Sequence, residues 1–395
     1  MPGPEVVILS AARTPIGKYG GSLRDVHPAE LGAVASRAAI ERAGIKPEDI
    51  DEVLMGHARQ AGSGPNPGRQ VGHRAGVPDS SPAQTINKAC ASSLQSIASG
   101  AQSILLGESK IVLAGGIESM SRMPYLIDAV DARWGHKMGN FTLVDAMYRD
   151  GFTCSICDML MGETAETLGR QYGVTREASD AFALDSQKKA KAAIDAGHFS
   201  REIAPITITV KGKPVIIDRD EHPRGDTTLD SLRKLPPVFG GGIITAGSSS
   251  GITDGGAALV LTSSEHAKAR GLTPRARILG WASAGVDPRS MGIGPVPAIK
   301  KLTERTGLKI DDFDLVELNE AFAPQVLAVL HDVPVPADRL NVNGGAIAIG
   351  HPIGATGARI VVTLLHELER RNARRGLATL CVSGGMGMAL AIERI

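Results

Sequence analysis

The chain has 395 residues, a length that corresponds to two or three domains of average size. Hydrophobic residues make up 43% of the chain and charged residues 22%, a globular composition that excludes a disordered or fibrous protein. The 43 Lys and Arg residues balance 42 Asp and Glu residues, so the net charge is +1 and nucleic acid is not expected as the main partner.

Glycine is abundant, with 47 residues, whereas Phe, Trp and Tyr number only 7, 2 and 4. These counts favour an aliphatic core in which backbones approach one another closely. The four cysteines are too few for a disulfide framework, and neither a signal peptide nor an apolar run of about 18 residues is recognisable. We therefore expect a cytoplasmic protein that does not enter a membrane.

The first expected element is a buried strand at residues 6–9. Residues 41–54 (ERAGIKPEDIDEVL) then match residues 304–317 (ERTGLKIDDFDLVE) at seven of fourteen positions, with an offset of 263. Each copy has the pattern of a helix end with glycine, an Asp-rich turn and a buried strand. Chance similarity of two such junctions is the alternative, but the agreement extends beyond Gly and Asp. We predict two duplicated α/β halves.

Cys90 follows a strand-like segment at residues 85–86 and precedes a helix rich in Ala and Ser. A thiol at a helix N-terminus lies in the positive field of the helix dipole, which lowers its pKa, and the free N–H groups there are oxyanion donors. The pattern predicts a nucleophile. A buried structural cysteine is the commoner fate of a lone Cys and is the alternative.

The segment at residues 121–249 differs in character from both halves. It contains Trp134, a Met-rich stretch, an amphipathic helix at residues 176–196 and a Gly/Ser-rich end. Because so long an insertion in a compact fold is usually functional, we interpret it as a loop domain that covers the active site. The expected domains are residues 1–120 together with 250–272, the loop domain at 121–249, and residues 273–395.

His351 lies in a glycine-rich block, and the following Pro352 favours an extended backbone at this histidine. The offset of 263 maps Cys90 onto position 353, so equivalent loops of the two halves are expected to meet and bring the thiol and the imidazole to one site. A rigidly held histidine is suited to act as a general base. A structural histidine is the alternative.

Two further residues end predicted strands. Asn319 lies between a strand and a helix, where its alternative role is only that of the helix N-cap. Cys381 precedes a glycine turn between two buried strands, so its side chain is expected to be exposed.

Three other patterns give weaker indications of a catalytic or binding role. Cys154 and Cys157 form a C-x-x-C motif without a second pair, so surface or interface cysteines are favoured over a metal or redox site. The glycines of two further stretches are interpreted as duplicated strand-end turns rather than a nucleotide loop: Gly115, Gly116, Gly384 and Gly385. A basic cluster is interpreted as a solvated face, with steering of an anionic substrate as the alternative: Arg370, Arg371, Arg374 and Arg375.

Taken together, seven stretches resemble the thiolase family along essentially the whole chain: ARTPIG (12–17), NKACASS (87–93), GGIESMS (115–121), GETAE (162–166), NEAFA (319–323), NVNGGAIAIGHPIGATG (341–357) and the LCVSGGMG turn. The block around His351 is long and specific. The resemblance implies a thiolase-like α/β fold of two duplicated halves in five layers, α-β-α-β-α, with an inserted loop domain. It also implies a homo-oligomer, either a dimer or a dimer of dimers.

The resemblance implies a role for each matched residue. Cys90 is the nucleophile that accepts the acyl group from CoA, and His351 deprotonates it. Cys381 moves the α-proton in the Claisen step. Asn319 holds a water that, with His351, stabilises the enolate oxygen, while backbone N–H groups of Cys90 and Ser383 bind the thioester oxyanion.

It further implies residues that contact the substrate. The positions matched to contacts with CoA or the acyl group are Arg224, Ser231, Ala246, Ser250, Met161, Met291, Ala321 and Phe322. No metal or redox cofactor is expected, because an acyl carrier, a base and two oxyanion holes suffice for thioester condensation. The substrates implied are acetyl-CoA, acetoacetyl-CoA and CoA, and neither nucleic acid nor a membrane is an expected partner.

Three positions depart from the family pattern. Ser383 stands where glycine is usual and is strained if its φ is positive, Ser248 stands where Asn is common, and Leu160 removes a polar contact to the pantetheine arm. The expected activity is that of an acetyl-CoA C-acetyltransferase, with a 3-ketoacyl-CoA thiolase of β-oxidation as the alternative. A non-catalytic acyl-CoA-binding relative is the alternative from another class.

Overall fold

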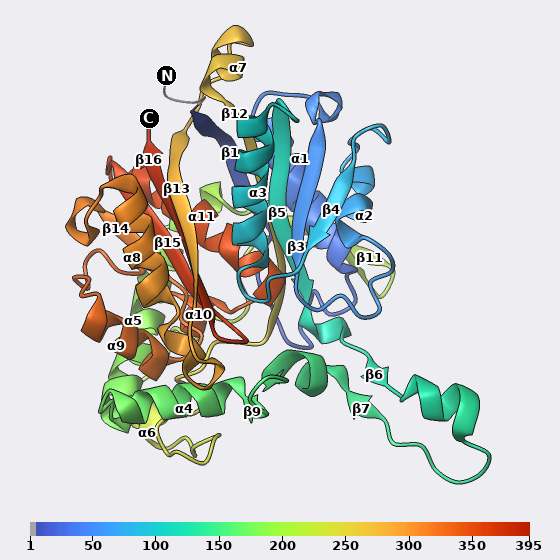
Figure 1. Cartoon of the computed structure of the whole chain (residues 1–395), viewed down its shortest axis with the longest axis vertical. Helices are drawn as coiled ribbons and strands as arrows, with labels where there is room; N and C mark the ends of the chain where they lie inside the picture. Colours follow the sequence, from blue (N-terminus) through green and yellow to red (C-terminus); the bar gives the residue numbers. More distant parts are fainter. Residues whose placement is uncertain (1–4) are drawn as a thin grey trace.

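The computed structural model, which describes residues 5–395, is built on one long mixed sheet (Figure 1). Its strands lie in the order β14 (Leu315–Leu318), β15 (Arg375–Val382), β16 (Met386–Arg394), β13 (Ala276–Gly285), β1 (Val6–Arg13), β12 (Thr253–Ser263), β5 (Ile111–Ser119), β3 (Glu52–His57) and β4 (Ala83–Ile86). The short β2 (Gly17–Lys18) pairs with β12.

The sheet is symmetric about the pair β1–β13, which is joined at only two residue pairs, Val7 with Arg277 and Ile8 with Ala276. Outward from this pair, each half has two antiparallel pairings and then a parallel one: β1–β12–β5–β3 on one side and β13–β16–β15–β14 on the other. The predicted duplication into two α/β halves is therefore confirmed.

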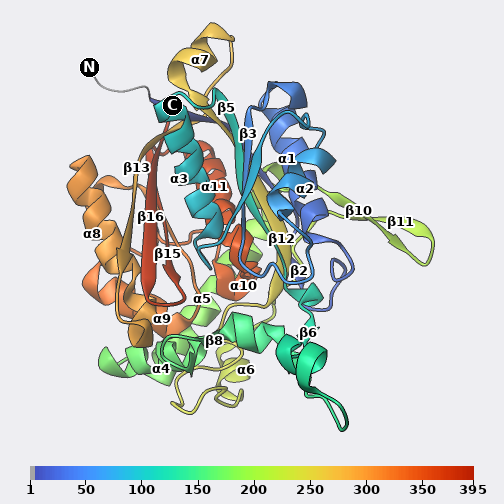
Figure 2. The same ribbon diagram turned by 45° about the vertical axis from the view of Figure 1, so that its right-hand side comes forward.

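Helices complete five layers, which Figure 2 shows nearly edge-on. The outer face of the first half is covered by α1 (Pro28–Arg42) and α2 (Pro67–Arg74), and that of the second by α8 (Pro295–Thr306) and α9 (Ala323–Asp332). Between the halves, α3 (Ser92–Leu106) packs against α11 (Ile353–Arg370). Two further helices are short: α7 (Ser264–Ala269) follows β12, and α10 (Ala346–Ile349) precedes α11.

The repeated sequence motif makes the same turn in both halves. The N–H of Lys46 donates to Asp49, and the N–H of Lys309 donates to Asp312, each over 2.8 Å. Asp51 then accepts the N–H groups of residues 110 and 111, and Asp314 those of residues 374 and 375, at the start of the neighbouring strand. The spacing of these carboxylates, which is the same in both halves, thus aligns the parallel pairs β3–β5 and β14–β15.

The two glycine pairs have different roles, which corrects the prediction that both form turns. Gly384 and Gly385 do form the turn between β15 and β16, with φ of +85° and +83°. Gly115 and Gly116 instead lie within β5. A Cβ on Gly116 would lie 2.3 Å from the carbonyl oxygen of Gly354, so glycine there lets the start of α11 approach the strand.

The chain between β5 and β12 leaves the sheet and crosses its lower end in Figure 1. It contains β6 (Tyr125–Leu126), β7 (Val144–Asp145), β8 (Thr153–Cys154), β9 (Met159–Leu160), α4 (Met161–Gln171), α5 (Arg176–Asp195), β10 (Ile206–Val210), β11 (Lys213–Ile217) and α6 (Leu229–Arg233). The helix predicted at residues 176–196 is α5. Short 3-10 or π segments lie at Pro47–Asp49, Met120–Arg122, Asp131–Gly135, Tyr148–Phe152, His198–Arg201, Pro288–Ile293 and Ile310–Asp312.

An arm made of residues 123–148 projects from the body at the lower right of Figure 1. Its large apolar side chains are unusually exposed: Tyr125, Val130, Trp134, Met138, Leu143 and Tyr148. Trp134 is 81% and Met138 89% exposed. Within residues 5–395, no helix combines the length and apolarity needed to span a membrane.

Candidate active site

Cys90 lies at a sharp turn between β4 and α3. The preceding Ala89 has a φ of +44°, a left-handed conformation that is uncommon for residues other than glycine. Asn87 fixes this turn, because its Oδ1 accepts the N–H of Ala89 and its Nδ2 donates to the carbonyl of Ala58, both over 3.0 Å. The thiol is thereby held directly before the first turn of α3, where the sequence pattern predicts it.

The electrostatic environment of Cys90 differs from the expectation of a lowered pKa. Burial raises the pKa of this thiol above its ordinary value. The positive charge of Arg59 and hydrogen bonds from the backbone N–H groups of Ser383 and of Cys90 itself oppose that rise. The prediction was wrong because it counted the helix N-terminus and left out the cost of burying a thiolate.

Arg59 was not singled out by the sequence, in which nothing distinguishes it from a surface arginine. It follows β3 and is only 8% exposed. Its guanidinium donates to the carbonyl of Gly151 over 2.6 Å, and its backbone N–H donates to Glu118. Glu118 also accepts the N–H of Gly354, over 2.8 Å, so Arg59 lies where the Cys90 loop and the start of α11 meet.

His351 lies between α10 and α11, and its backbone N–H donates to the carbonyl of Gly251 over 3.0 Å. Its ring Nδ1 is 2.6 Å from Oγ1 of Thr356, and that hydroxyl donates its proton to the carbonyl of Pro352 over 2.9 Å. Because the hydroxyl has only one proton, it must accept from Nδ1–H of the ring. The proton of the neutral ring is therefore on Nδ1, and Nε2 carries a free lone pair.

The Nε2 atom is buried and has no hydrogen-bond partner among the described residues. Burial lowers the pKa of His351 to about 3, with the positive charges of Arg359 and Arg59 contributing. The ring is thus neutral at physiological pH, which is the state that a general base requires.

Contacts between the halves bring the Cys90 and His351 loops together. Ser93 accepts the N–H of Ala358 over 2.8 Å, across 265 positions of sequence. Cys90 itself packs in a cluster with Ala58, Met120 and Ile353, the last of which is two residues from His351. The offset of the repeat had indicated this meeting of equivalent loops.

Cys381 lies near the end of β15 and is only 1% exposed, so the prediction of an exposed side chain was wrong. Side chains from distant parts of the sequence enclose its thiol. It packs in one cluster with four residues predicted to contact the acyl group: Met161, Met291, Ala321 and Phe322. Burial raises the pKa of its thiol, and the nearby charge of Cys90 raises it further, so the two sulfurs lie within electrostatic reach of each other.

Asn319 follows β14, and its N–H donates to the carbonyl of Thr379, two residues before Cys381. It is not a helix N-cap, because Phe322 occupies that position of α9. Its amide is 1% exposed, and neither side-chain atom has a partner among the described residues. The buried amide of Gln325, which the sequence analysis missed, is equally unpartnered. Buried side-chain amides normally form hydrogen bonds, so both amides are suited to hold a water molecule or a polar group of the substrate.

The residues predicted to contact CoA are divided between two places. Ser250 is half-buried, and its N–H donates to the carbonyl of Ala321 over 3.0 Å, which connects it to the Cys381 cluster. Arg224, Ser231 and Ala246 are exposed, and Ser231 caps α6 together with Thr228.

Two of the three departures from the family pattern are accommodated without strain. Ser383 does not have a positive φ, so the strain expected there is not found. Ser248 is buried, and its hydroxyl accepts the N–H of Thr245 over 2.9 Å.

The structure also places the basic cluster and the C-x-x-C motif, for which the sequence indicated a role only weakly. The four arginines are not free cations, because Arg370 and Arg371 pair with Glu367 while Arg374 and Arg375 pair with Glu393. Cys154 is buried and Cys157 half-buried, which contradicts a surface position for Cys154. No group of three or more His, Cys, Asp or Glu residues in the described part of the chain is arranged to hold a metal ion.

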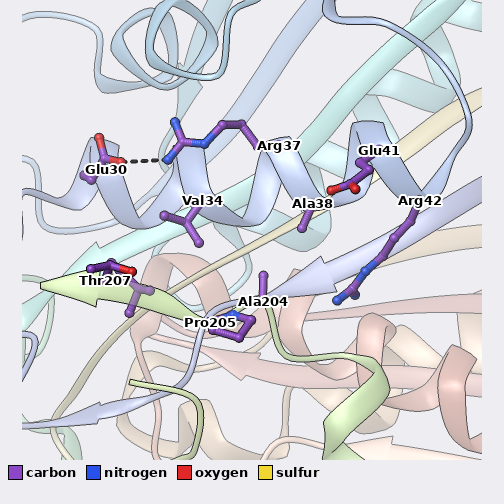
Figure 3. Close-up of a pocket in the computed structure, with 10 residues that line it drawn as sticks. Glu30, Val34, Arg37, Ala38, Glu41, Arg42, Ala204, Pro205 and Thr207 are labelled. Carbon is purple, nitrogen blue, oxygen red and sulfur yellow. Dashed lines mark hydrogen bonds and ion pairs between the residues drawn. The ribbon is translucent and has the colours of Figure 1, made fainter. Parts of the chain in front are cut away.

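A pocket lies away from these thiols (Figure 3). It has a volume of about 460 Å³ between one face of α1 and residues 204–207 at the start of β10. Glu30 and Arg37 form an ion pair at its rim, and none of the predicted site residues lines it.

Comparisons with known proteins agree with the fold. Residues 6–265 match the family model "Thiolase, N-terminal domain" and residues 272–394 match "Thiolase, C-terminal domain". The chain is 52% identical over 392 residues to an acetyl-CoA acetyltransferase of Cupriavidus necator, covering 99% of each chain. The crystal structure of the Bacillus anthracis acetyl-CoA acetyltransferase has 46% identity and a TM-score of 0.97, covering 100% of this chain and 99% of that one. Human mitochondrial 3-ketoacyl-CoA thiolase has 43% identity and a TM-score of 0.95, covering 99% of each.

Proposed function

The chain belongs to the thiolase family, and we propose that it is an acetyl-CoA C-acetyltransferase that interconverts two acetyl-CoA with acetoacetyl-CoA and CoA. The observation that carries the proposal is the neutral, buried imidazole of His351, whose bare Nε2 lies at the loop that packs against the Cys90 turn. Full-length similarity to acetyl-CoA acetyltransferases supports the short acyl chain.

In the first half-reaction, Cys90 is acylated. His351 Nε2 takes the thiol proton while the sulfur attacks the thioester carbonyl of acetyl-CoA, and the proton then passes to the leaving CoA thiolate. The oxyanion that forms is stabilised by the N–H groups of Cys90 and Ser383, which already point at the Cys90 sulfur. Free CoA leaves, and acetyl-Cys90 remains.

In the second half-reaction, Cys381 acts on a second acetyl-CoA. Burial raises the pKa of this thiol, so its thiolate is a stronger base than an exposed one and is suited to the weakly acidic α-carbon. The Cys381 thiol first gives its proton to Nε2 of His351, and the resulting thiolate takes the α-proton of acetyl-CoA. The Nε2–H of the imidazolium and a water on the unpartnered Asn319 amide stabilise the enolate oxygen. The carbanion attacks acetyl-Cys90, the Cys90 thiolate leaves as acetoacetyl-CoA forms, and the His351 imidazolium returns its proton to Cys90.

The loop domain at residues 121–249 covers this site and, with Arg224, Ser231, Ala246 and Ser250, binds CoA. Met161 and Met291 restrict the acyl pocket beside Cys381. The reaction as written requires no metal or redox cofactor. We place the enzyme in the cytoplasm, because its four free cysteines suit a reducing compartment.

We also propose that the enzyme is a homo-oligomer, a dimer or a dimer of dimers. The exposed Trp134 and Met138 of the arm support an assembly in which other copies cover apolar surface.

Mass spectrometry after mixing with acetyl-CoA tests the acyl carrier. We expect one acetyl group on the peptide that contains Cys90, and none in the Cys90→Ala variant, which should lose all turnover. An unmodified Cys90 in an enzyme that is otherwise folded would favour a non-catalytic CoA-binding protein. Comparison of kcat/KM for acetoacetyl-CoA and 3-ketodecanoyl-CoA tests the chain length, and a large preference for the latter would favour a β-oxidation thiolase.

The division of labour between the two thiols is tested by Cys381→Ser. This variant should still acylate Cys90 at a measurable rate, but its condensation rate should fall by about a hundredfold or more, because a serine hydroxyl is a far poorer base at the α-carbon. Equal loss of both partial reactions would contradict the roles proposed for Cys90 and Cys381.

A further inference from the structure

Cys154 and Cys157 lie at a tight hairpin between β8 and β9, outside the chemistry proposed above. Cys154 pairs with Met159 across the hairpin, and Cys157 lies in the four-residue turn that connects the strands. The N–H of Asp158 donates to the carbonyl of Cys154 over 2.8 Å, and Asp158 has a φ of +54°. This turn folds the two cysteines back toward each other, close enough for each thiol to influence the pKa of the other.

The hairpin contacts the turn that follows Cys381. Burial raises the pKa of the Cys154 thiol, and the backbone N–H groups of Cys157, Ile156 and Gly384, which lie near its sulfur, oppose that rise and leave the pKa below its ordinary value. The Ile156 side chain lies 3.5 Å from where a Cβ on Gly384 would be. Two adjacent N–H groups of one turn therefore lie near two different sulfurs. The N–H of Ser383 is directed at Cys90, and the N–H of Gly384 is directed at Cys154.

The hairpin is also continuous with the acyl pocket. Strand β9 leads without a break into α4, whose first residue is Met161, and Met161 packs in the Cys381 cluster. A change in the hairpin is therefore transmitted both to the Ser383 amide and to the pocket wall.

We propose that Cys154 and Cys157 form a redox-active dithiol that closes into a disulfide and reversibly lowers the activity of the neighbouring site. The C-x-x-C spacing, the hairpin that folds Cys157 back toward Cys154 and the amides near Cys154 carry this assignment. Those amides also lower the pKa of the Cys154 thiol, whereas burial and the neighbouring Cys154 sulfur raise the pKa of Cys157.

The oxidant is a small disulfide, RSSR, and the step balances. The half-buried Cys157 is the accessible thiol; its thiolate attacks RSSR, forms a mixed disulfide and releases one RSH with the Cys157 proton. The Cys154 thiolate then attacks the Cys157 sulfur and releases the second RSH with the Cys154 proton. Two protein thiols are oxidised to one disulfide, and RSSR is reduced to two RSH.

Closure weakens the contact between the Cys154 sulfur and the Gly384 N–H, because a disulfide sulfur is a poorer hydrogen-bond acceptor than a thiolate and the new bond to Cys157 redirects it. The turn at residues 383–385 then loses an anchor, and the Ser383 amide is displaced from Cys90. The oxidised enzyme is expected to be slower in acyl transfer, a consequence that rests on the proposed function.

The disulfide itself is tested without an activity assay. The Cys90→Ser variant, which cannot react at residue 90, is equilibrated with mixtures of reduced and oxidised glutathione, alkylated and digested with trypsin. We expect the peptide that holds both cysteines to become two hydrogens lighter and to resist alkylation as the oxidised fraction rises. Free thiols in oxidised glutathione alone, or a bond to Cys381 instead, would overturn the proposal.

The effect on activity is tested with wild-type enzyme and the matched Cys157→Ser variant, both first acetylated to shield Cys90. After oxidised glutathione, wild type should lose about tenfold or more of its activity and regain it with dithiothreitol, whereas Cys157→Ser should keep its activity. Equal losses in the two proteins would refute the coupling. Cys157→Ala provides a second variant if the serine variant folds poorly, and inactivity of untreated wild type would contradict the proposed function alone.

Discussion

At the scale of single residues, the position of one proton decides whether His351 can act as a base. The Thr356 hydroxyl donates its only proton to the carbonyl of Pro352, so it can only accept a proton from the ring. This fixes the ring proton on Nδ1. The lone pair on Nε2 follows from this arrangement rather than from the histidine alone. Thr356 is a positioning residue, four positions into α11.

Thr356→Val should therefore lower kcat/KM by about tenfold or more, because the imidazole loses the acceptor that selects its tautomer. The acylation rate of Cys90 across pH 5–9 checks this, and the profile should change shape as well as height. Thr356→Ser, which keeps the hydroxyl, is the control and should retain most of the activity. An unchanged profile in the valine variant would show that another group orients the ring.

Arg59 gives a prediction about pH dependence. Its positive charge favours the Cys90 thiolate, so its removal should raise the pKa of Cys90. In Arg59→Met, alkylation by iodoacetamide should be roughly tenfold slower at neutral pH, and its profile should move to higher pH. Arg59→Lys should lie nearer wild type. Arg219→Met, which removes an exposed arginine paired with Asp218, is the control and should leave the profile unaltered.

At the scale of elements, the close contact between β5 and α11 determines how the two loops meet. Gly116 permits that contact, since a Cβ there would lie 2.5 Å from the Ser93 side chain as well as against Gly354. Gly116→Ala should destabilise the protein by about 1–3 kcal/mol through overpacking and should also reduce activity. Urea unfolding measures the first effect. Gly240→Ala, where nothing lies within 4 Å, is the control and should be neutral.

The sequence predicted several elements well, because their signals are local. The Asp-rich repeat predicted a helix, turn and strand in both halves, and the strands at Val6 and around Cys381 are present. Gly115 and Gly116 were misassigned because a glycine pair has the same local pattern in a turn and in a strand crossed closely by a helix. Only the position of α11, which comes more than two hundred residues later, distinguishes the two.

The candidate site shows the same division between local and tertiary information. Cys90, His351, Cys381 and Asn319 could be selected from motifs, but the burial of Cys381 could not, since the neighbours that enclose it come from distant elements. Arg59 and Gln325 were missed for that reason too. Neither has a local pattern that separates it from an ordinary surface residue.

At the scale of the whole molecule, the arm is the feature least explained by a single chain. Its exposed apolar residues predict that the assembly depends on it. The double variant of Trp134→Ser and Met138→Ser should sediment as a smaller species than wild type. Ile216→Ser removes an exposed apolar residue of β11, outside the arm, and should leave the sedimentation unchanged. Identical sedimentation of all three proteins would exclude the arm as a contact between copies.

The separation of the thiol and the imidazole between two halves has a consequence for synthesis. The ribosome adds Cys90 to the chain long before it adds His351. Strand β1 can pair with β12 and β13 only after these later strands have been synthesised, so the sheet cannot form earlier. A nascent chain therefore carries its future nucleophile without the base that activates it. Unfinished or prematurely terminated chains should remain inert toward thioesters in the cell, and self-acylation should begin only when translation is nearly complete.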